Sequence, residues 1–402
     1  MPPPFLTVLT APVPGARERV IQGLRRRLRR IVKPGVPLPA ASPYPGHCAL
    51  VRSVVEGLRA VGADFNFNPR RLSDVGRVVY APANESLLQA AAMKRAGRID
   101  YLVAGPVNAL FADESDGILL TPEIDRLIVA HEWQADFVRD FPGARAKCRA
   151  CPCGVDVEWW RPSGRARTST ALVYWKSGDE GFCAQVEQIV KACGLDPHRV
   201  RALHGEHALF SPADYRALLD QSAIGVFLST FETQGLALAE AWSMDVPAVV
   251  WDPRGAAQWR GRTFQSHSSA PYLTPATGRL WRTIDQLEPV LRSALADRAS
   301  FHPREWMLAN MTDAICSAAL LEIIREGARP QRPAGTPRCN ASRAASETGS
   351  AGLTGRCATA AGSTPCSATG RCAFISAAAT TGCPASSTST PARPGPWTSR
   401  WI

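Results

Sequence analysis

The sequence contains no run of apolar residues that approaches the roughly 20 needed for a membrane-spanning helix. Its start, MPPPFLTVLTAPVPGARERV, has no basic stretch followed by a long apolar one, so we expect no secretory signal. The composition, with 45% hydrophobic and 20% charged residues, is typical of a soluble globular protein. We therefore expect a cytoplasmic protein whose 402 residues form two domains of ordinary size.

The cysteines do not form a disulfide pattern. Five of the 12 lie after residue 328, and the other seven are an odd number at scattered positions. Without a secretory signal, reduced thiols are expected. Cys148, Cys151 and Cys153 offer three soft ligands to zinc, but no fourth ligand stands at a usual spacing, and a structural zinc site needs four. We predict small buried residues there and no metal site.

The net charge of +11 falls mostly in the C-terminal part. Residues 328–402 hold eight arginines and one acidic residue, which leaves +4 for residues 1–327. So mild an excess predicts no phosphate-binding track, and we expect no nucleic acid among the partners. The alternative, an arginine-rich nucleic-acid binder, predicts DNA binding with a steep salt dependence.

Residues 328–402 are rich in Ala, Ser, Thr, Gly, Pro and Arg and show no apolar periodicity. Such a segment cannot bury enough apolar surface to offset its ordering entropy, so we predict a disordered tail. Its near absence of Lys, Asp, Glu and Tyr also resembles out-of-frame translation of a GC-rich gene. No function is assigned to it.

Residues 16–32 have the pattern of a basic amphipathic helix. Apolar residues recur there at helical spacing, opposite four arginines. A helix of this kind can lie on an anionic membrane surface, and it can equally present a solvated charged face while packing on its own domain. Peripheral contact with the inner face of the membrane therefore stays open.

Residues 5–327 alternate short apolar runs with segments of helical period, which is the pattern of parallel α/β units. Helices are predicted from residue 48, from residue 84, and near 179–193, 211–221 and 234–244. The predicted strands are Phe5–Thr10, Arg77–Ala81, Tyr101–Ala104 and Leu127–Ala130 in the first half, and Ala171–Trp175, Val200–Leu203, Ile224–Ser229 and Ala248–Trp251 in the second.

The two halves are separated where Gly154, Pro162 and Gly164 break the periodicity. We predict an acceptor-side Rossmann-like domain at 1–153, a donor-binding one at 154–327 and the tail at 328–402. Two such domains facing across a cleft would bind a ligand at their strand ends.

The segment 223–252, AIGVFLSTFETQGLALAEAWSMDVPAVVWD, carries the most chemical information. It predicts a strand, a loop, a helix and a second strand. A helix beginning near Gly235 offers free backbone amides to a diphosphate, and the glycine lets a ligand approach closely. Glu240, inside the helix, can accept hydrogen bonds from ribose hydroxyls, and Glu232, before it, can reach the hydroxyls of a sugar.

This segment resembles the E-x7-E segment of the retaining family 4 glycosyltransferases, which have the GT-B fold. The family usually has E-G-F-G-L-x-x-x-E and then A-x-x-x-G-x-P-V-V, and this chain has ETQGLALAE followed by AWSMDVPAVV. The departures are Thr233, Gln234 and Asp245. The resemblance extends over residues 40–327 and implies that the backbone around Gln234, Gly235 and Leu236 meets the donor diphosphate.

Weaker matches lie outside this segment. His131 stands before Glu132 and Trp133 where the family usually has Ser-Glu-Trp. Lys176 follows the strand where members often carry an Arg and a Lys against the diphosphate, and it is the one cation of the two present here.

In the first domain, Gly46 and His47 stand where the family has a glycine-rich turn near the acceptor and diphosphate. The sequence is equally compatible with a His47 that is exposed to solvent and binds nothing. The first-domain histidine that many members place near the reacting carbon has no counterpart around LVAGPVNALF, so the residue that activates the acceptor is unassigned.

The resemblance implies transfer of a hexose from a nucleoside diphosphate sugar to a hydroxyl acceptor, with retention of configuration. The chain has no DxD metal motif, and we expect neither a metal nor a cofactor other than the donor. Glu232 would position the sugar as the catalytic residue. Two alternatives remain open: a non-catalytic protein of the same fold that binds a nucleotide sugar, and a nucleotide-sugar epimerase.

Overall fold

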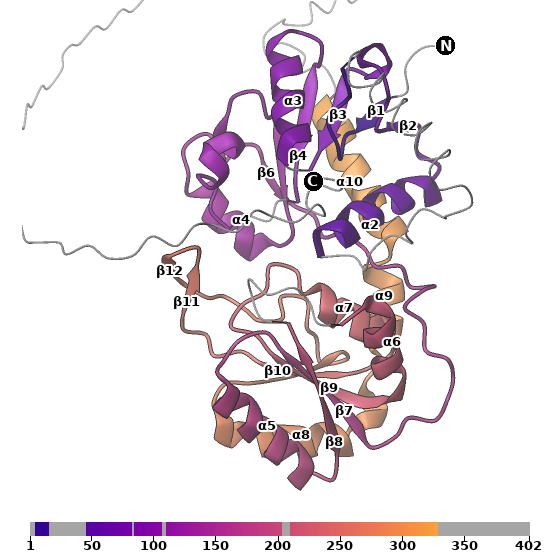
Figure 1. Cartoon of the computed structure of the whole chain (residues 1–402), viewed down its shortest axis with the longest axis vertical. Coiled ribbons are helices and arrows are strands. Elements are labelled where there is room, and N and C mark those ends of the chain that lie inside the picture. The colour runs from indigo at the N-terminus through magenta and orange to yellow at the C-terminus, as the bar shows by residue number, and fades with distance from the viewer. Residues whose placement is uncertain (1–4, 16–45, 83, 107–109, 203–209, 329–402) are drawn as a thin grey trace, which may run out of the picture. The chain divides into compact units, whose positions relative to one another are not determined.

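The computed structural model describes residues 5–15, 46–82, 84–106, 110–202 and 210–328. The predictions for residues 16–32 and for the tail beyond 328 lie outside these residues. The contacts of the chain divide it into two units, and all described residues lie in the first of them. That unit contains two parallel sheets with helices around them (Figure 1).

The first sheet has six strands in the order β2-β1-β3-β4-β5-β6, and all of its pairs are parallel. With its helices it is called the first lobe below. The strands are β1 (Leu6–Val8), β2 (Phe65–Phe67), β3 (Val78–Ala81), β4 (Tyr101–Ala104), β5 (Arg126–Val129) and β6 (Cys148–Ala150). The helices are α2 (Gly46–Ala60), α3 (Asn84–Arg95) and α4 (Glu132–Arg139).

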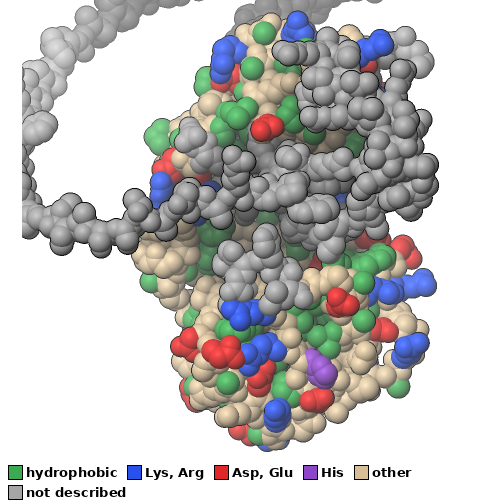
Figure 2. Space-filling view, in the orientation of Figure 1, with side chains coloured by type: hydrophobic (Ala, Val, Ile, Leu, Met, Phe, Trp, Pro, Cys, Tyr) green, Lys and Arg blue, Asp and Glu red, His purple; other side chains and the backbone are tan. Residues whose placement is uncertain are grey.

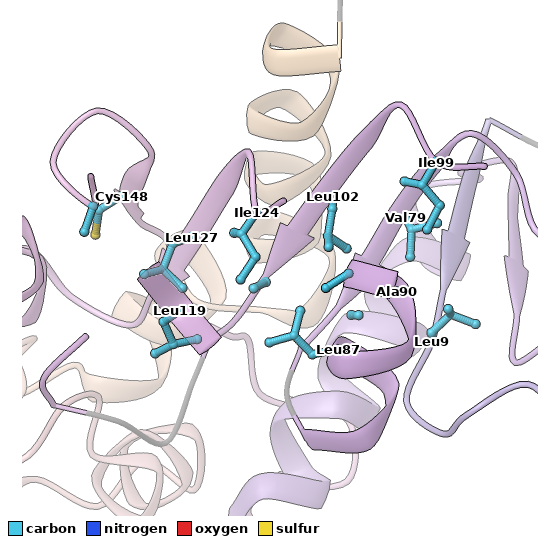
Figure 3. Close-up of a cluster of buried hydrophobic side chains, with 14 of the residues drawn as sticks. Leu9, Val79, Leu87, Ala90, Ile99, Leu102, Leu119, Ile124, Leu127 and Cys148 are labelled. Atoms are coloured by element: carbon cyan, nitrogen blue, oxygen red, sulfur yellow. The ribbon is translucent and has the colours of Figure 1, made fainter. Parts of the chain in front are cut away.

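Apolar residues on both sides of the strands account for the layers of the first lobe. Along β4, alternate residues enter different cores, because successive side chains of a strand point to opposite faces. Leu102 packs with Val79, Leu87 and Leu127 in the core that α3 covers (Figure 3). Val103 packs on the other face, in the core that includes α2.

The helix α10 (Asp313–Ala328) also packs on that second face of the first sheet, beside α2. The two helices approach so closely that a Cβ added to Gly57 would lie 2.1 Å from the Asp313 carbonyl oxygen. A helix from the interval predicted as the second domain, 154–327, thus completes the core of the first lobe.

The second sheet has the order β13-β10-β9-β7-β8, again with parallel pairs. With its helices it is called the second lobe below. The strands are β7 (Thr170–Trp175), β8 (Asp196–Arg201), β9 (Ser222–Leu228), β10 (Ala248–Trp251) and β13 (Gly278–Trp281), and β11 (Ala256–Trp259) with β12 (Arg262–Gln265) forms a separate hairpin. The helices are α5 (Glu180–Ala192), α6 (Pro212–Gln221), α7 (Leu236–Ser243), α8 (Ile284–Ala296) and α9 (Pro303–Asn310).

These parallel sheets confirm the predicted α/β class. One predicted strand, Val200–Leu203, is displaced: β8 begins at Asp196 because it pairs with β7 from Thr170 onwards, and it ends at Arg201. Across the described residues, no helix is long and apolar enough to cross a membrane.

Both sheets reverse their winding direction at one place, the topological switch point. In the second sheet the chain leaves β7 for β8 on one side and then returns to β9 on the other side. The first sheet does the same between β1 and β3. Doubly wound sheets bind ligands outside the carboxyl ends of the strands at such a point. The loops that follow β7 and β9 are therefore the place to look for a site.

Candidate functional site

Two charged residues follow the two switch-point strands of the second sheet. Lys176 comes directly after β7, and its backbone N–H donates to the Leu228 carbonyl at the end of β9 (3.0 Å). Its Nζ lies 2.6 Å from Oε1 of Glu232, and both side chains are mostly buried, with 19% and 14% exposed. The Ser229 hydroxyl shares its one hydrogen between this carboxylate oxygen (3.1 Å) and the Phe231 carbonyl (2.8 Å). The structure thus brings together Lys176 and Glu232, which are 56 residues apart in the sequence.

The backbone of Glu232 is held on both sides. Its N–H donates to the Ser268 carbonyl (3.0 Å), and its own carbonyl accepts from Nε1 of Trp133 (3.1 Å). Trp133 lies on α4 of the first lobe, is buried, and stacks on His267. A side chain of the first lobe therefore helps to fix the loop that carries the predicted catalytic carboxylate.

Trp133 belongs to the tripeptide in which His131 replaces the usual serine. The Nδ1 atom of His131 accepts a hydrogen bond from the Trp133 N–H (3.1 Å) and caps α4. Burial lowers the pKa of His131, which favours the neutral ring that this acceptor role requires. The replacement therefore keeps the capping function of a serine at a helix start.

The helix α7 begins directly after Gly235, which has φ 77° and ψ 58°. A side chain is strained in this left-handed conformation, so a glycine suits this cap. The amides of the first turn, from Leu236 onwards, have no partner within the helix and can bind an anion. Gln234 precedes the cap, but its side-chain amide both donates to and accepts from the backbone of Cys153 (2.6 and 3.0 Å). Because its side-chain amide is engaged in this way, Gln234 could contact a ligand only through its backbone.

Glu240 is the fifth of the eight residues of α7. The residue as a whole is partly exposed, whereas protein encloses its carboxyl group. None of the described side chains donates a hydrogen bond to its carboxylate. Burial raises its pKa to about 8, and the positive charge of Arg52 on α2 opposes part of that shift. An enclosed carboxyl group to which no described side chain donates is suited to accept hydrogen bonds from hydroxyl groups of a ligand.

Asp245, the third departure from the family pattern, occupies a left-handed turn after α7. Its φ is 60°, a conformation that explains the usual glycine at this position and that Asp adopts more readily than most residues. Its carboxylate accepts a hydrogen bond from the Arg304 backbone N–H (3.3 Å). The departure is thus accommodated locally and leaves the start of α7 unchanged.

The hairpin formed by β11 and β12 reaches the same region. Its turn residues Arg260 and Gly261 both have positive φ, and Arg262 donates to both carboxylate oxygens of Asp113 in the first lobe (2.7 and 2.8 Å). Phe264 packs edge-on against Phe231, with ring centroids 5.0 Å apart. The residue next to Glu232 is therefore anchored by the hairpin.

The remaining predicted site residues are placed only in part. Gly46 is the first residue of α2, whereas the residues before it and the side chain of His47 lie outside the described part of the chain. Cys148, Cys151 and Cys153 are buried in two different cores. Burial raises the pKa of Cys148 to about 11 and that of Cys151 to about 12, so both are unreactive thiols. No metal-binding group of three or more His, Cys, Asp or Glu occurs among the described residues.

On the face shown in Figure 2, basic and acidic side chains are interspersed over the described surface of the second lobe.

Two contributors to the site, Trp133 and Ser229, were not predicted as such from the sequence. Ser229 stands three residues before Glu232 within the same loop, so its nearness follows from the local sequence. Trp133 is 99 residues away from Glu232, and only its place in the His-Glu-Trp tripeptide marked it.

No protein-family model matches this chain, and no curated protein sequence does either. Among solved structures, it is similar to HepE from Anabaena in complex with UDP, with 13% identity, a TM-score of 0.49, and coverage of 80% of this chain and 99% of HepE. It is also similar to the lipopolysaccharide outer core galactosyltransferase WaaB, with 11% identity, a TM-score of 0.46, and coverage of 80% and 98%. Sucrose-phosphate synthase from Thermosynechococcus elongatus has 12% identity, a TM-score of 0.44, and coverage of 80% and 98%. At this level of likeness the chemistry has to be argued from the residues themselves.

Proposed function

We propose that this protein is a glycosyltransferase of the GT-B type that transfers a hexose from a nucleoside diphosphate sugar to a hydroxyl acceptor with retention of configuration. The observation that carries the proposal is the placement of Lys176, Glu232 and the start of α7 together at the switch point of the second sheet. Glu240 on the same helix adds an enclosed carboxyl group. A diphosphate linked to two sugar rings needs positive potential beside its phosphates, which Lys176 and the start of α7 supply. It also needs groups that accept hydrogen bonds from the hydroxyls of each ring, which the two glutamates supply.

In this scheme each residue has one task. Lys176 and the first-turn amides of α7 bind the diphosphate and stabilise the negative charge that develops on it as it leaves. Glu240 accepts hydrogen bonds from the ribose hydroxyls, and Glu232 accepts them from the transferred sugar. The departing diphosphate can take the acceptor's proton on the same face of the sugar, so retention requires no carboxylate nucleophile and no metal.

The ion pair between Lys176 and Glu232 is part of this proposal. In the free protein each group satisfies the other at 2.6 Å, which keeps both charges in place in a mostly buried position. A donor diphosphate competes for the ammonium group, and the sugar hydroxyls then donate to the carboxylate. Donor binding therefore exchanges one set of charge-assisted hydrogen bonds for another.

A ligand-dependent unfolding experiment tests the proposal. UDP, the nucleotide in the HepE complex, heads a panel that also contains ADP, GDP and their hexose conjugates. A ligand present at 100 times its dissociation constant stabilises the folded state by about 2.7 kcal/mol, which is a readily measured rise in the unfolding temperature. If no nucleotide or nucleotide sugar raises that temperature, the proposed function is wrong. Binding without product formation from any acceptor supports the non-catalytic alternative, and interconversion of the sugar supports the epimerase.

A further inference from the structure

Tyr174 lies beside the proposed donor site without having a task in it. It is the penultimate residue of β7, two positions before Lys176. Its ring packs near Tyr215 and Phe227, with centroids 5.8 and 5.4 Å away. Tyr215 and Phe227 are buried, whereas Tyr174 is only partly buried. A polar side chain thus enters the core that contains α6 and α7 while keeping some accessible surface.

Tyr174 and Tyr215 differ in what their hydroxyl groups do. The Tyr215 hydroxyl is buried and donates to the Ala237 carbonyl in the first turn of α7 (2.9 Å). The Tyr174 hydroxyl has no hydrogen-bond partner among the residues the structure describes. The residue is only partly buried, so a partner from outside the protein can reach this hydroxyl, and beside the proposed donor site that partner is the ligand.

Both carboxylates of the site act electrostatically on this hydroxyl, whose ring packs near Tyr215 beside the first turn of α7. Burial raises the pKa of Tyr174, and the negative charges of Glu232 and Glu240 raise it further. The phenol therefore remains neutral and keeps the O–H with which it can donate a hydrogen bond. In a nucleoside diphosphate sugar the diphosphate stands between the sugar and the ribose. If Glu232 meets the sugar and Glu240 meets the ribose, the group nearest the hydroxyl is the diphosphate.

We propose that Tyr174 donates its hydroxyl hydrogen to an oxygen of the donor diphosphate and is a second phosphate ligand beside Lys176. This inference rests on the proposed function, because it takes the order of groups in the donor from it. The resemblance described above implies an Arg and a Lys against the diphosphate, whereas this chain has Lys176 alone. A neutral donor adds a phosphate contact there without burying a second positive charge.

A matched pair of tyrosine substitutions tests this. Tyr174→Phe keeps the ring and removes the hydroxyl, so affinity for the tightest-binding nucleoside diphosphate of UDP, ADP and GDP should fall about tenfold or more, as for loss of a hydrogen bond to a charged group. Affinity for the corresponding nucleoside should stay unchanged, and so should the unfolding temperature. Tyr215→Phe should instead lower the unfolding temperature, because it removes a buried hydrogen bond to the Ala237 carbonyl, and change diphosphate affinity less than twofold.

Isothermal titration of the full chain with both ligands separates the outcomes. Unchanged diphosphate affinity in Tyr174→Phe would overturn the inference, and so would equal losses for the diphosphate and the nucleoside, because packing alone would explain those. If the unsubstituted protein binds none of the three nucleotides, the proposed function fails and this inference fails with it. If that protein binds a nucleotide and Tyr174→Phe binds it equally well, only this inference fails.

Discussion

Glu240 is a carboxyl group whose protonation couples folding, pH and ligand binding. Its pKa in the folded protein is about 8, against 4.5 for an ordinary glutamate. Between these two values the folded state holds a proton that the unfolded state has lost. The free energy of unfolding therefore falls as the pH rises through this window. Above pH 8 the stability that the folded state gains from a neutral Glu240 is lost. Each unit of pKa shift corresponds to about 1.4 kcal/mol, which limits the total effect to several kcal/mol.

Glu240→Gln removes the titration and keeps the shape. The variant should equal the unsubstituted protein in stability near pH 5 and exceed it by about 1 kcal/mol or more at pH 8.5, because Gln has no charge to desolvate. Urea unfolding at pH 5, 7 and 8.5 measures this difference, with Glu56→Gln on the exposed face of α2 as the control. Parallel pH profiles for Glu240→Gln and the unsubstituted protein would refute the assignment of a raised pKa.

The same group makes a prediction for the ligand. Ribose hydroxyls donate to an ionised carboxylate, so a nucleoside diphosphate that reaches Glu240 should drive out its proton at pH 7. Titration in two buffers with different ionisation enthalpies counts the protons released. Glu240→Gln should release fewer protons than the unsubstituted protein and bind the nucleotide about tenfold or more weakly. Equal proton release by both proteins would place the ribose elsewhere.

Three further predictions concern the ion pair and the helix contact. Lys176→Ala should weaken nucleoside diphosphate binding about tenfold and nucleoside binding much less, and equal losses in titration would remove Lys176 from the phosphate site. Glu232→Gln should leave diphosphate affinity unchanged or higher, because Lys176 is released from its partner at 2.6 Å. Product formation should fall about tenfold or more, and full turnover by this variant would instead support the non-catalytic alternative. Gly57→Ala should destabilise the fold by about 1–3 kcal/mol in urea unfolding, because its Cβ would meet the Asp313 carbonyl at 2.1 Å, whereas Gly181→Ala, which meets only one side-chain oxygen at 3.4 Å, should cost far less.

Local sequence was sufficient where an element is a buried apolar run. The strands β4 and β10 have the predicted bounds, because each is a short apolar stretch enclosed on both faces. The strands β2, β6 and β13 were missed, since FNF, CRA and GRLW contain polar residues and are too short to show a period. The hairpin was missed because its turn is Arg260–Gly261 and lacks the Asn-Gly or Asp-Gly pair that marks such turns.

The candidate site divides in the same way, and the division follows from how a doubly wound sheet is built. Residues directly after a strand or at a helix start, such as Lys176 and Gly235, are placed by the element that precedes or follows them, so the local pattern predicted both. The partners of Glu232 depend on which strands become neighbours and on how the lobes meet. Pairing of β7 with β9 brings Lys176 to Glu232, and α4 brings Trp133 to its carbonyl. No periodicity within one segment contains this information, because it arises only when sheets from distant parts of the chain have formed. The Glu232 carboxylate is held by Lys176 and Ser229, and its backbone carbonyl is held by the Trp133 indole. A group fixed in this way would lose little conformational freedom if a donor bound there, so the distant contacts hold in place the carboxylate that the local pattern identified.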